Sequence, residues 1–413
     1  MPRGAARPVA RVPLYIPALL ISASAVSILS TDLYTPSLPH LQGYFGADAE
    51  AVQLTMSLNL LGFALAQLLY GPLSDRFGRR PILLGGMLGF ALSTLACALA
   101  PDLDSLVAAR VLQGVTACTE VVVGYAVIRE LYDEAGAVKV LGAYGMAVAL
   151  APALGPLIGG QMHVAFGWRS NFALLLVLIV VVTLLIWRYL PETLARPDHE
   201  ATRPRRVLAG YAALLSNGAY MTYALILSGT MAALFAFITE GPFLYIEGLG
   251  VATQNYGAYY AAVVLAYFFG AMAANRAAGR LPIDAIAAAG LLLTALGPLV
   301  LILLTALNQV GVLSFTVALS AFALGLGLLF ASAPVRAFDV CQAGRGLAAA
   351  LLGALQIGLA ACGALLVAWL HDGTAWALSL TMAVCTLPPL LAYLVIRPWR
   401  FRAAPGEGPA ATA

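Results

Sequence analysis

Two long uncharged segments flank a short charged segment in the first quarter of the chain. Residues 52–70 and 82–101 carry no charged side chain, whereas residues 71–81 between them contain an aspartate and three arginines. At about 1.5 Å per residue, each uncharged segment is long enough to cross a hydrocarbon layer ~30 Å thick as a helix. We therefore predict two membrane-spanning helices joined by a very short charged turn.

Apolar segments of this length recur along the whole chain. Of its 413 residues 62% are hydrophobic and only 10% are charged, against about 25% charged in soluble proteins. A soluble bundle cannot bury so many helices that are apolar all round, so we predict an all-α membrane protein with twelve spans. The predicted spans cover residues 13–31, 52–70, 82–101, 105–128, 140–162, 168–190, 216–239, 256–275, 282–304, 310–333, 346–370 and 374–396.

The basic residues predict the orientation. With twelve spans, every Lys and Arg except Arg110 and Arg169 falls on the side of the N-terminus. Positive residues accumulate on the cytoplasmic side, so we expect both termini in the cytoplasm and a multi-pass protein of the inner (plasma) membrane. The predicted outer loops carry acids instead, namely Asp48, Glu50, Asp102, Asp104, Glu247 and Asp372.

The longest polar segment, residues 191–209, divides the predicted spans into two sets of six. We predict an N-terminal bundle over 1–190, a cytoplasmic linker over 191–209, and a C-terminal bundle with a short tail over 210–413. Residues 270–280 repeat the glycine and arginine pattern of residues 71–81 in a degenerate form without the aspartate. Internal repeats of this kind indicate two related bundles with a site between them near the midplane.

The charged turn also resembles the signature loop of the major facilitator transporters. That family implies two six-helix bundles and a conformational lock in this loop. We expect the Asp75 carboxylate to lie at the positive end of a later helix that begins near Arg345, where it would hold the two bundles together. The residues that carry the resemblance are Gly71, Asp75, Arg76, Gly78, Arg79 and Arg80.

Further stretches resemble the twelve-span drug:proton antiporters of this superfamily. Residues 110–114 are similar to the family's buried arginine motif, and residues 151–160 to its antiporter motif, with Ala151 where a glycine is common. Residues 31–39, 167–172 and 190–194 resemble the bicyclomycin/chloramphenicol-resistance (Bcr/CflA) branch. Two prolines four apart should bend the helix, and the glycines should let another helix approach closely. The antiporter motif residues are Pro152, Gly155, Pro156, Gly159 and Gly160.

Polar side chains inside the predicted spans are candidates for function, because a charge at the bilayer centre costs at least ~2.5–3.5 kcal/mol. Gln113 and Glu120 lie within ~80° of Arg110 on one helix face, given 100° per residue, and should face a water-filled cavity. Asp32 should lie near the outer edge of the membrane at the depth of Arg110, where the two side chains can pair. We expect Asp32, Arg110, Gln113 and Glu120 to form the proton-coupling and substrate cavity.

For each of these residues a purely structural role stays open: an ion pair for Arg110, a helix-end carboxylate for Asp32 and a packing carboxylate for Glu120. Which carboxylate couples to protons also stays open. Some multidrug members of the group carry a second acid eight residues before the aspartate, where this chain has Ser24. Glu240 precedes Gly-Pro at the predicted outer end of a span, and we expect it to be an interfacial cap.

Enzyme and metal-binding functions are disfavoured. The four histidines form no cluster, and the chain has neither an HExxH motif nor a phosphate-binding loop. The five cysteines form no CxxC pair. We expect no catalytic residues, no cofactor and no metal.

The expected function is proton-driven antiport that exports drugs or other small amphipathic molecules, of the chloramphenicol and bicyclomycin kind, by alternating access. The expected partners are the substrate, protons and the lipid bilayer, with no nucleic acid and a monomeric state. Two alternatives are an exporter of a native metabolite and an uptake proton symporter of the same fold.

Overall fold

The computed structural model describes residues 13, 15–132, 134–194, 196–199, 201–339 and 345–396. Regular structure in this described part is helical, without a β-strand. The helices of the first half are α1 (Tyr15–Asp32), η1 (Thr35–Ser37), α2 (Leu38–Phe45), α3 (Ala49–Phe77), α4 (Arg79–Leu99), α5 (Leu103–Leu131), α6 (Glu134–Phe166) and α7 (Arg169–Tyr189). Those of the second half are α8 (Pro204–Leu215), α9 (Gly218–Phe243), η2 (Leu244–Gly248), α10 (Thr253–Ala277), α11 (Ile283–Ala306), α12 (Val312–Asp339), α13 (Arg345–Trp369) and α14 (Ala375–Ile396).

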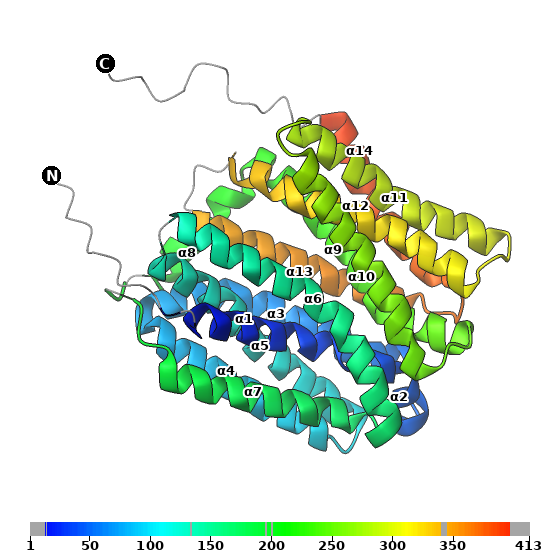
Figure 1. Ribbon diagram of the computed structural model, residues 1–413, viewed down its shortest axis with the longest axis horizontal. Helices are drawn as coiled ribbons and strands as arrows, with labels where there is room; N and C mark the ends of the chain where they lie inside the picture. Colours follow the sequence, from blue (N-terminus) through cyan, green and yellow to red (C-terminus); the bar gives the residue numbers. More distant parts are fainter. Residues whose placement is uncertain are drawn as a thin grey trace.

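The long helices run the length of one bundle, with α8 at one end and α2 at the other (Figure 1). We call the end with α8 and the α3–α4 turn the loop end, and the opposite end the α2 end. Among the described residues, eleven helical segments are long and apolar enough to cross a membrane. The predicted span 140–162 falls in α6, many of whose side chains lie outside the described residues. The count of twelve spans therefore stays a prediction.

Apolar side chains cover the outside of this bundle. Leu92, Leu184 and Leu303 are 59%, 57% and 58% exposed. Polar groups such as Arg110, Glu120 and Glu240 are instead buried between helices. This distribution is the reverse of a soluble protein's and fits hydrocarbon as the surrounding solvent.

Most helix contacts stay within two groups. One group is α1–α7 and the other is α9–α14, and they meet mainly through α3 against α13 and α6 against α10. At the α2 end a single apolar core takes side chains from both groups, including Tyr34 and Phe172 of the first and Phe237, Tyr256 and Phe315 of the second. Two smaller cores lie toward the loop end, one built by α1, α4, α5 and α7 and the other by α8, α9, α11, α12, α13 and α14.

The charged turn is shorter than the sequence indicated. Helix α3 continues through the charged residues to Phe77, and α4 begins at Arg79, which leaves Gly78 alone as the joint. Gly78 has φ +101°, and a Cβ there would lie 2.6 Å from the Glu192 carboxylate. Both facts favour glycine at this position.

Two helices extend further at the α2 end than predicted. After Asp32 the chain continues as η1 and α2, because Pro36 and Pro39 occupy the first turns of new helical segments instead of ending the structure. Likewise α9 runs through Pro242 and is prolonged by η2 to Gly248. Asp32 and Glu240 are consequently enclosed by protein, at 3% and 0% exposure. That Asp32 lies near the outer edge of the membrane, and that Glu240 is an interfacial cap, stay predictions.

The linker predicted over 191–209 ends in a helix. Helix α8 begins at Pro204, so the predicted boundary between residues 209 and 210 falls inside it. Its Tyr211 hydroxyl donates to the Leu68 carbonyl of α3 at 3.2 Å. The N–H of Asp198 donates to the Asp75 carbonyl at 2.9 Å. The segment between the two helix groups is therefore held against the end of α3.

Candidate functional site

Arg110 on α5 is fully buried and satisfied by neutral groups. Its guanidinium donates to the Ser30 carbonyl at 2.9 Å, to the Thr55 carbonyl at 3.2 Å and to the Gln113 side-chain oxygen. The group also lies over the Tyr34 ring, 4.6 Å from its centroid. Ser30 belongs to the last turn of α1, where the negative end of the helix dipole favours a cation. These contacts offset the desolvation of a buried charge.

Gln113 extends this network to a further helix. Its amide nitrogen donates to the Thr94 hydroxyl of α4 at 2.8 Å. Asn59 of α3 donates to the Arg110 carbonyl at 2.7 Å, and Gly114 leaves room for the backbone at Asn59. The arginine motif thus joins α5 to α1, α3 and α4 within the first helix group.

Asp32 faces the other helix group instead of Arg110. The Tyr260 hydroxyl of α10 donates to an Asp32 oxygen at 3.5 Å. No ion pair joins Asp32 to Arg110 in the described part of the chain, which differs from the predicted pairing. The arginine instead reaches the carbonyl two residues before Asp32. The carboxylate therefore lies at the contact between the two helix groups.

Glu120 is buried without a partner. It is 1% exposed, and within the described structure neither carboxylate oxygen has a hydrogen-bond partner. Gln113 and Glu120 share α5, but Gln113 contacts Arg110 and Thr94 instead. A carboxylate enclosed in this way must either bind a proton or meet a cationic group, because an isolated buried charge is too costly.

The glycines of α6 lie where the two groups meet. A Cβ on Gly155 would lie 2.6 Å from the Asp32 Cβ, and one on Gly159 would overlap the Leu33 carbonyl. A Cβ on Gly160 would lie 2.8 Å from the Thr253 carbonyl at the start of α10. Helix α6 is continuous through Pro152 and Pro156. The predicted close approach is confirmed, and it brings α6 against both the end of α1 and α10.

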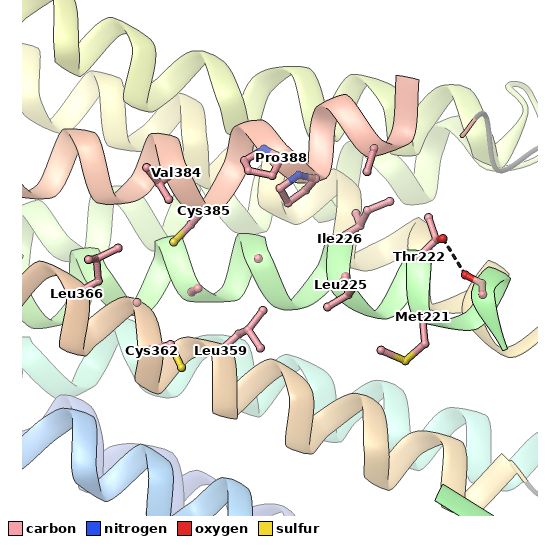
Figure 2. A pocket seen from close by; sticks show the side chains of 16 residues that line it. Met221, Thr222, Leu225, Ile226, Leu359, Cys362, Leu366, Val384, Cys385 and Pro388 are labelled. Carbon is pink, nitrogen blue, oxygen red and sulfur yellow. Dashed lines mark hydrogen bonds between the residues drawn. The ribbon is translucent and has the colours of Figure 1, made fainter. Parts of the chain in front are cut away.

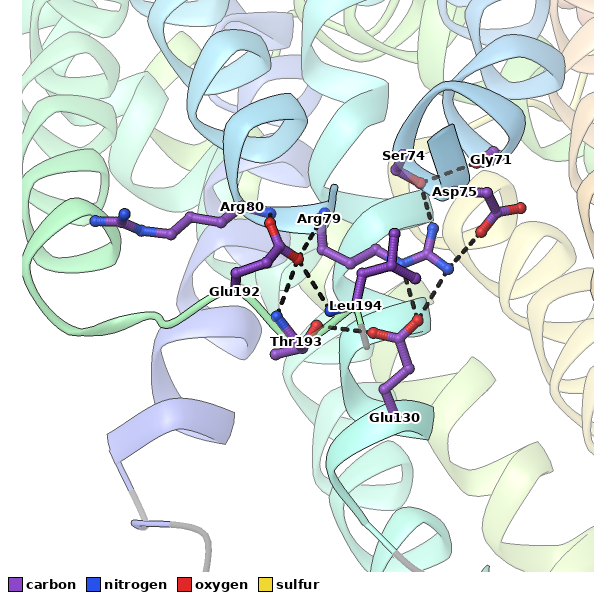
Figure 3. A network of polar contacts seen from close by, with 9 residues as sticks. All are labelled: Gly71, Ser74, Asp75, Arg79, Arg80, Glu130, Glu192, Thr193 and Leu194. Atoms are coloured by element: carbon purple, nitrogen blue, oxygen red, sulfur yellow. Dashed lines mark hydrogen bonds and ion pairs between the residues drawn. The ribbon is translucent and has the colours of Figure 1, made fainter. Parts of the chain in front are cut away.

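A polar network at the loop end surrounds the signature turn (Figure 3). Arg79 pairs with Asp75 at 2.5 Å and with Glu130 at 2.9 Å, and donates to the Ser74 hydroxyl at 2.5 Å. The side chain of Arg76 donates to Thr202 at 2.6 Å. Gly71 accepts from the Ser74 hydroxyl.

Glu192 caps the start of α4 within the same network. It accepts from the N–H groups of Arg79 and Arg80 at 3.0 and 3.1 Å, and from those of Thr193 and Leu194 at 3.0 Å. Burial acts to raise its pKa, but the four N–H donors together lower the pKa of Glu192. A carboxylate at the positive end of a helix is stabilised in the same sense.

The predicted contact between Asp75 and the start of the later helix is not described. Helix α13 does begin at Arg345, but residues 340–344 and the Arg345 side chain lie outside the described residues. Among the described residues, the Asp75 side chain forms its ion pair with Arg79, one turn away on the other side of Gly78.

A pocket of about 490 Å³ lies apart from these acids (Figure 2). It is formed by α9, α13 and α14, and its walls are almost wholly apolar, with Leu225, Leu359, Leu366 and Val384 among them. Asp32, Arg110 and Glu120 belong to α1 and α5 and do not line it. We therefore place the candidate site at the buried acids and not in this pocket.

Several partners of the predicted residues were missed from sequence. Glu130 pairs with Arg79, and Tyr260 donates to Asp32. Gln53 and His371 both contact the Glu240 carboxylate. These four residues lie in or beside apolar runs without a motif of their own. The one available signal for Glu130 is its place directly after Arg129, at the predicted cytoplasmic end of a span. The other three are neutral or loop residues whose importance depends on contacts between distant helices.

No group of three His, Cys, Asp or Glu that could hold a metal occurs in the described chain.

The fold and these enclosed polar groups define an all-helical, multi-pass membrane protein with charged residues held between its helices. The chain belongs to the Major Facilitator Superfamily, whose sequence model matches residues 20–356.

Two relatives show the resemblance over most of the chain. The multidrug transporter MdfA of Shigella boydii serotype 4 (strain Sb227) is 28% identical over 365 residues, which are 88% of this chain and 89% of that protein. The multidrug transporter MdfA of Yersinia pestis bv. Antiqua (strain Angola) is 31% identical over 321 residues, 76% of this chain and 77% of that protein.

Among solved structures, the partially occluded inward-open xylose transporter XylE from E. coli has a TM-score of 0.73 and covers 94% of this chain and 97% of its own. At 13% identity it supports the fold alone.

Proposed function

We propose that this protein is a proton-driven antiporter of the Bcr/CflA type that exports small amphipathic drugs across the inner membrane. The chain is similar to proteins named multidrug transporters. The single observation that carries the proposal is the pair of buried carboxylates, Asp32 and Glu120, neither of which is paired with a cation in the described structure. Unpaired intramembrane acids are expected in proton relays.

In this proposal the loop end faces the cytoplasm together with both termini, and the α2 end faces outward. The two helix groups are the moving parts of an alternating-access cycle. Their shared core at the α2 end, and the contacts of α6 with α1 and α10, support an arrangement closed toward the outside. The protein works as a monomer in the lipid bilayer.

We assign different roles to the two acids. Asp32 lies where α1, α6 and α10 meet, so a change in its protonation alters the contact between the groups. Glu120 belongs to the first group and has an unused carboxylate, so it suits a proton or the cationic end of a substrate. Arg110 and Gln113 hold α1 and α5 in the geometry that both acids require.

The signature turn acts as a lock in this cycle. Arg79 forms ion pairs with Asp75 and Glu130 and a hydrogen bond with Ser74 beside the α3–α4 joint. Helix α13, which begins at Arg345, packs along α3. We propose that Asp75 exchanges its partner between Arg79 and the start of α13 when the loop end closes.

Uptake into inside-out vesicles tests the direction and the driving force. Energised vesicles that contain the protein should accumulate chloramphenicol or a cationic dye, and a protonophore should abolish the accumulation. Matched vesicles with the Asp32→Asn variant serve as the control. Loss of substrate from energised vesicles would instead indicate an uptake symporter. No movement of any drug, with a proton-coupled flux of a cell metabolite, would indicate a metabolite exporter.

A further inference from the structure

Two histidines from distant parts of the chain meet at the α2 end. The four histidines form no cluster in the sequence. In the structure, however, the ring centroids of His40 on α2 and His163 in the last turn of α6 lie 4.9 Å apart, with the ring planes inclined by 74°. His40 is exposed and His163 is partly buried, so the pair can be reached from the surface.

The start of α7 braces the backbone beside both histidines. Asn171 donates to the hydroxyl of Ser37, which directly precedes α2, at 3.1 Å. The neighbouring Ser170 donates to the carbonyl of Met162, the residue before His163, at 3.0 Å. The two histidines are therefore attached to segments that two consecutive residues of α7 hold in place. Support of this kind is what a preformed binding site requires.

The separation of the rings matches that of two ligands on one metal ion. A transition metal bound to an imidazole nitrogen at ~2.1 Å lies about 3.2 Å from the ring centre. Rings whose centres lie 4.9 Å apart then make an angle of about 100° at the ion, between the ~90° of octahedral and the ~109° of tetrahedral coordination. Rotation about the Cβ–Cγ bonds, which are soft torsions, can direct one nitrogen of each ring at the ion.

His163 has a nitrogen that a metal ion would satisfy. Its Nδ1 is enclosed and, among the described residues, has no hydrogen-bond partner. A buried polar atom without a partner costs free energy, and imidazole is the commonest protein ligand for metals. The guanidinium of Arg169, at the start of α7, is engaged with two carbonyls at the end of α4. The exposed acids Asp48 and Glu50 follow α2 and favour cations at this surface.

We propose that His40 and His163 bind a transition-metal ion such as Zn²⁺, Ni²⁺ or Cu²⁺, and that this ion fastens α2 to the end of α6. Water completes the coordination, since the described part of the chain groups no third His, Cys, Asp or Glu with the pair. Mg²⁺ and Ca²⁺ do not fit, because they prefer oxygen ligands. The site goes beyond the proposed function and does not rest on it.

Electron paramagnetic resonance with Cu²⁺ tests whether both rings hold one ion. The full-length protein is purified without a histidine tag, and its five native cysteines are replaced, so that these competing ligands are absent. In this parent protein, one equivalent of Cu²⁺ should show coupling to two imidazole nitrogens. In His40→Ala or His163→Ala it should show coupling to one at most. Zn²⁺ should displace the copper from the parent protein.

Titration with Zn²⁺ measures what each ring contributes. Either single substitution should weaken binding at least about tenfold, because even the loss of a group that only supports a metal ligand costs about ten- to a hundredfold. The double variant should bind little more weakly than either single one, since two ligands of one ion do not act additively. Zn²⁺ should raise the melting temperature of the parent protein more than that of the variants. His199→Ala removes an exposed histidine near the loop end, and this matched control should keep full affinity.

Copper coupled to a single nitrogen in the parent protein would overturn the proposal, as would unchanged zinc affinity in either single variant. Additive losses in the double variant would also overturn it, because they would indicate two independent surface sites. Melting curves without metal show whether the variants fold. His40→Gln and His163→Gln keep a polar side chain of similar size, so they replace any alanine variant that unfolds and should lose binding to the same extent.

Discussion

The substitution Glu120→Gln should reduce the export of cationic substrates far more than the export of neutral ones, because the Glu120 carboxylate has no partner. Both of its oxygens are buried without partners, so Glu120→Gln replaces one unsatisfied polar group by another of the same size. We expect insertion and thermal stability to change little. A cationic substrate that meets Glu120 would lose its buried counter-charge, at a cost of about 3 kcal/mol or more. That corresponds to roughly a hundredfold loss of export efficiency.

A neutral substrate loses at most one hydrogen bond, about 0.5–1.5 kcal/mol, or less than about tenfold. The assay is drug resistance and vesicle transport, with a cationic dye and chloramphenicol measured side by side in a host without other exporters. Thr119→Ser, next to Glu120 on the same helix and also buried, is the matched control and should affect both substrates equally and weakly. Undiminished export of the dye by Glu120→Gln would assign Glu120 to packing and refute the reasoning.

Three further changes are expected to act at other parts of the molecule. Asp75→Asn removes an ion pair of Arg79 and should reduce transport without loss of insertion, and unchanged label distances across the loop end would exclude the lock. Gly159→Ala places a methyl group on the Leu33 carbonyl and should lower transport and thermal stability together, whereas Gly145→Ala, an exposed control with open space, should lower neither. Glu192→Gln should lower the free energy of unfolding by less than about 1 kcal/mol because the site is exposed. Since the pKa of Glu192 is lowered, this difference should be present above its ordinary 4.5 and shrink on acidification, and a difference that grows in acid would contradict the capping role.

The fold class could be predicted from the sequence because the hydrocarbon of a membrane requires every backbone polar group to be satisfied within the protein. Long uncharged runs, such as residues 82–101, must become helices that satisfy their own backbone groups. The same rule misjudged the ends of some spans. Asp32 looked like a helix end because the first apolar run ends at residue 31, and Glu240 because Gly241 and Pro242 follow it, but at both positions the chain continues in further helical segments.

The partners of the candidate residues could be predicted only where they lie on one helix or in one motif. Gln113 was found with Arg110 because they are three residues apart. Tyr260 and His371 were not found, because their contacts with Asp32 and Glu240 depend on how separate helices pack. The neutral environment of Arg110 was missed for a related reason: carbonyl acceptors leave no trace in the choice of side chains.

Proton release on substrate binding tests the central claim most directly. The protein in detergent, in weakly buffered solution, is mixed with chloramphenicol while a pH indicator records released protons. The proposed antiport predicts release by the wild type, release with the neutral substrate by Glu120→Gln, and none by Asp32→Asn at equal substrate binding. Full release by Asp32→Asn would exclude Asp32 as the coupling site. Substrate binding without proton release by the wild type would contradict proton-coupled export.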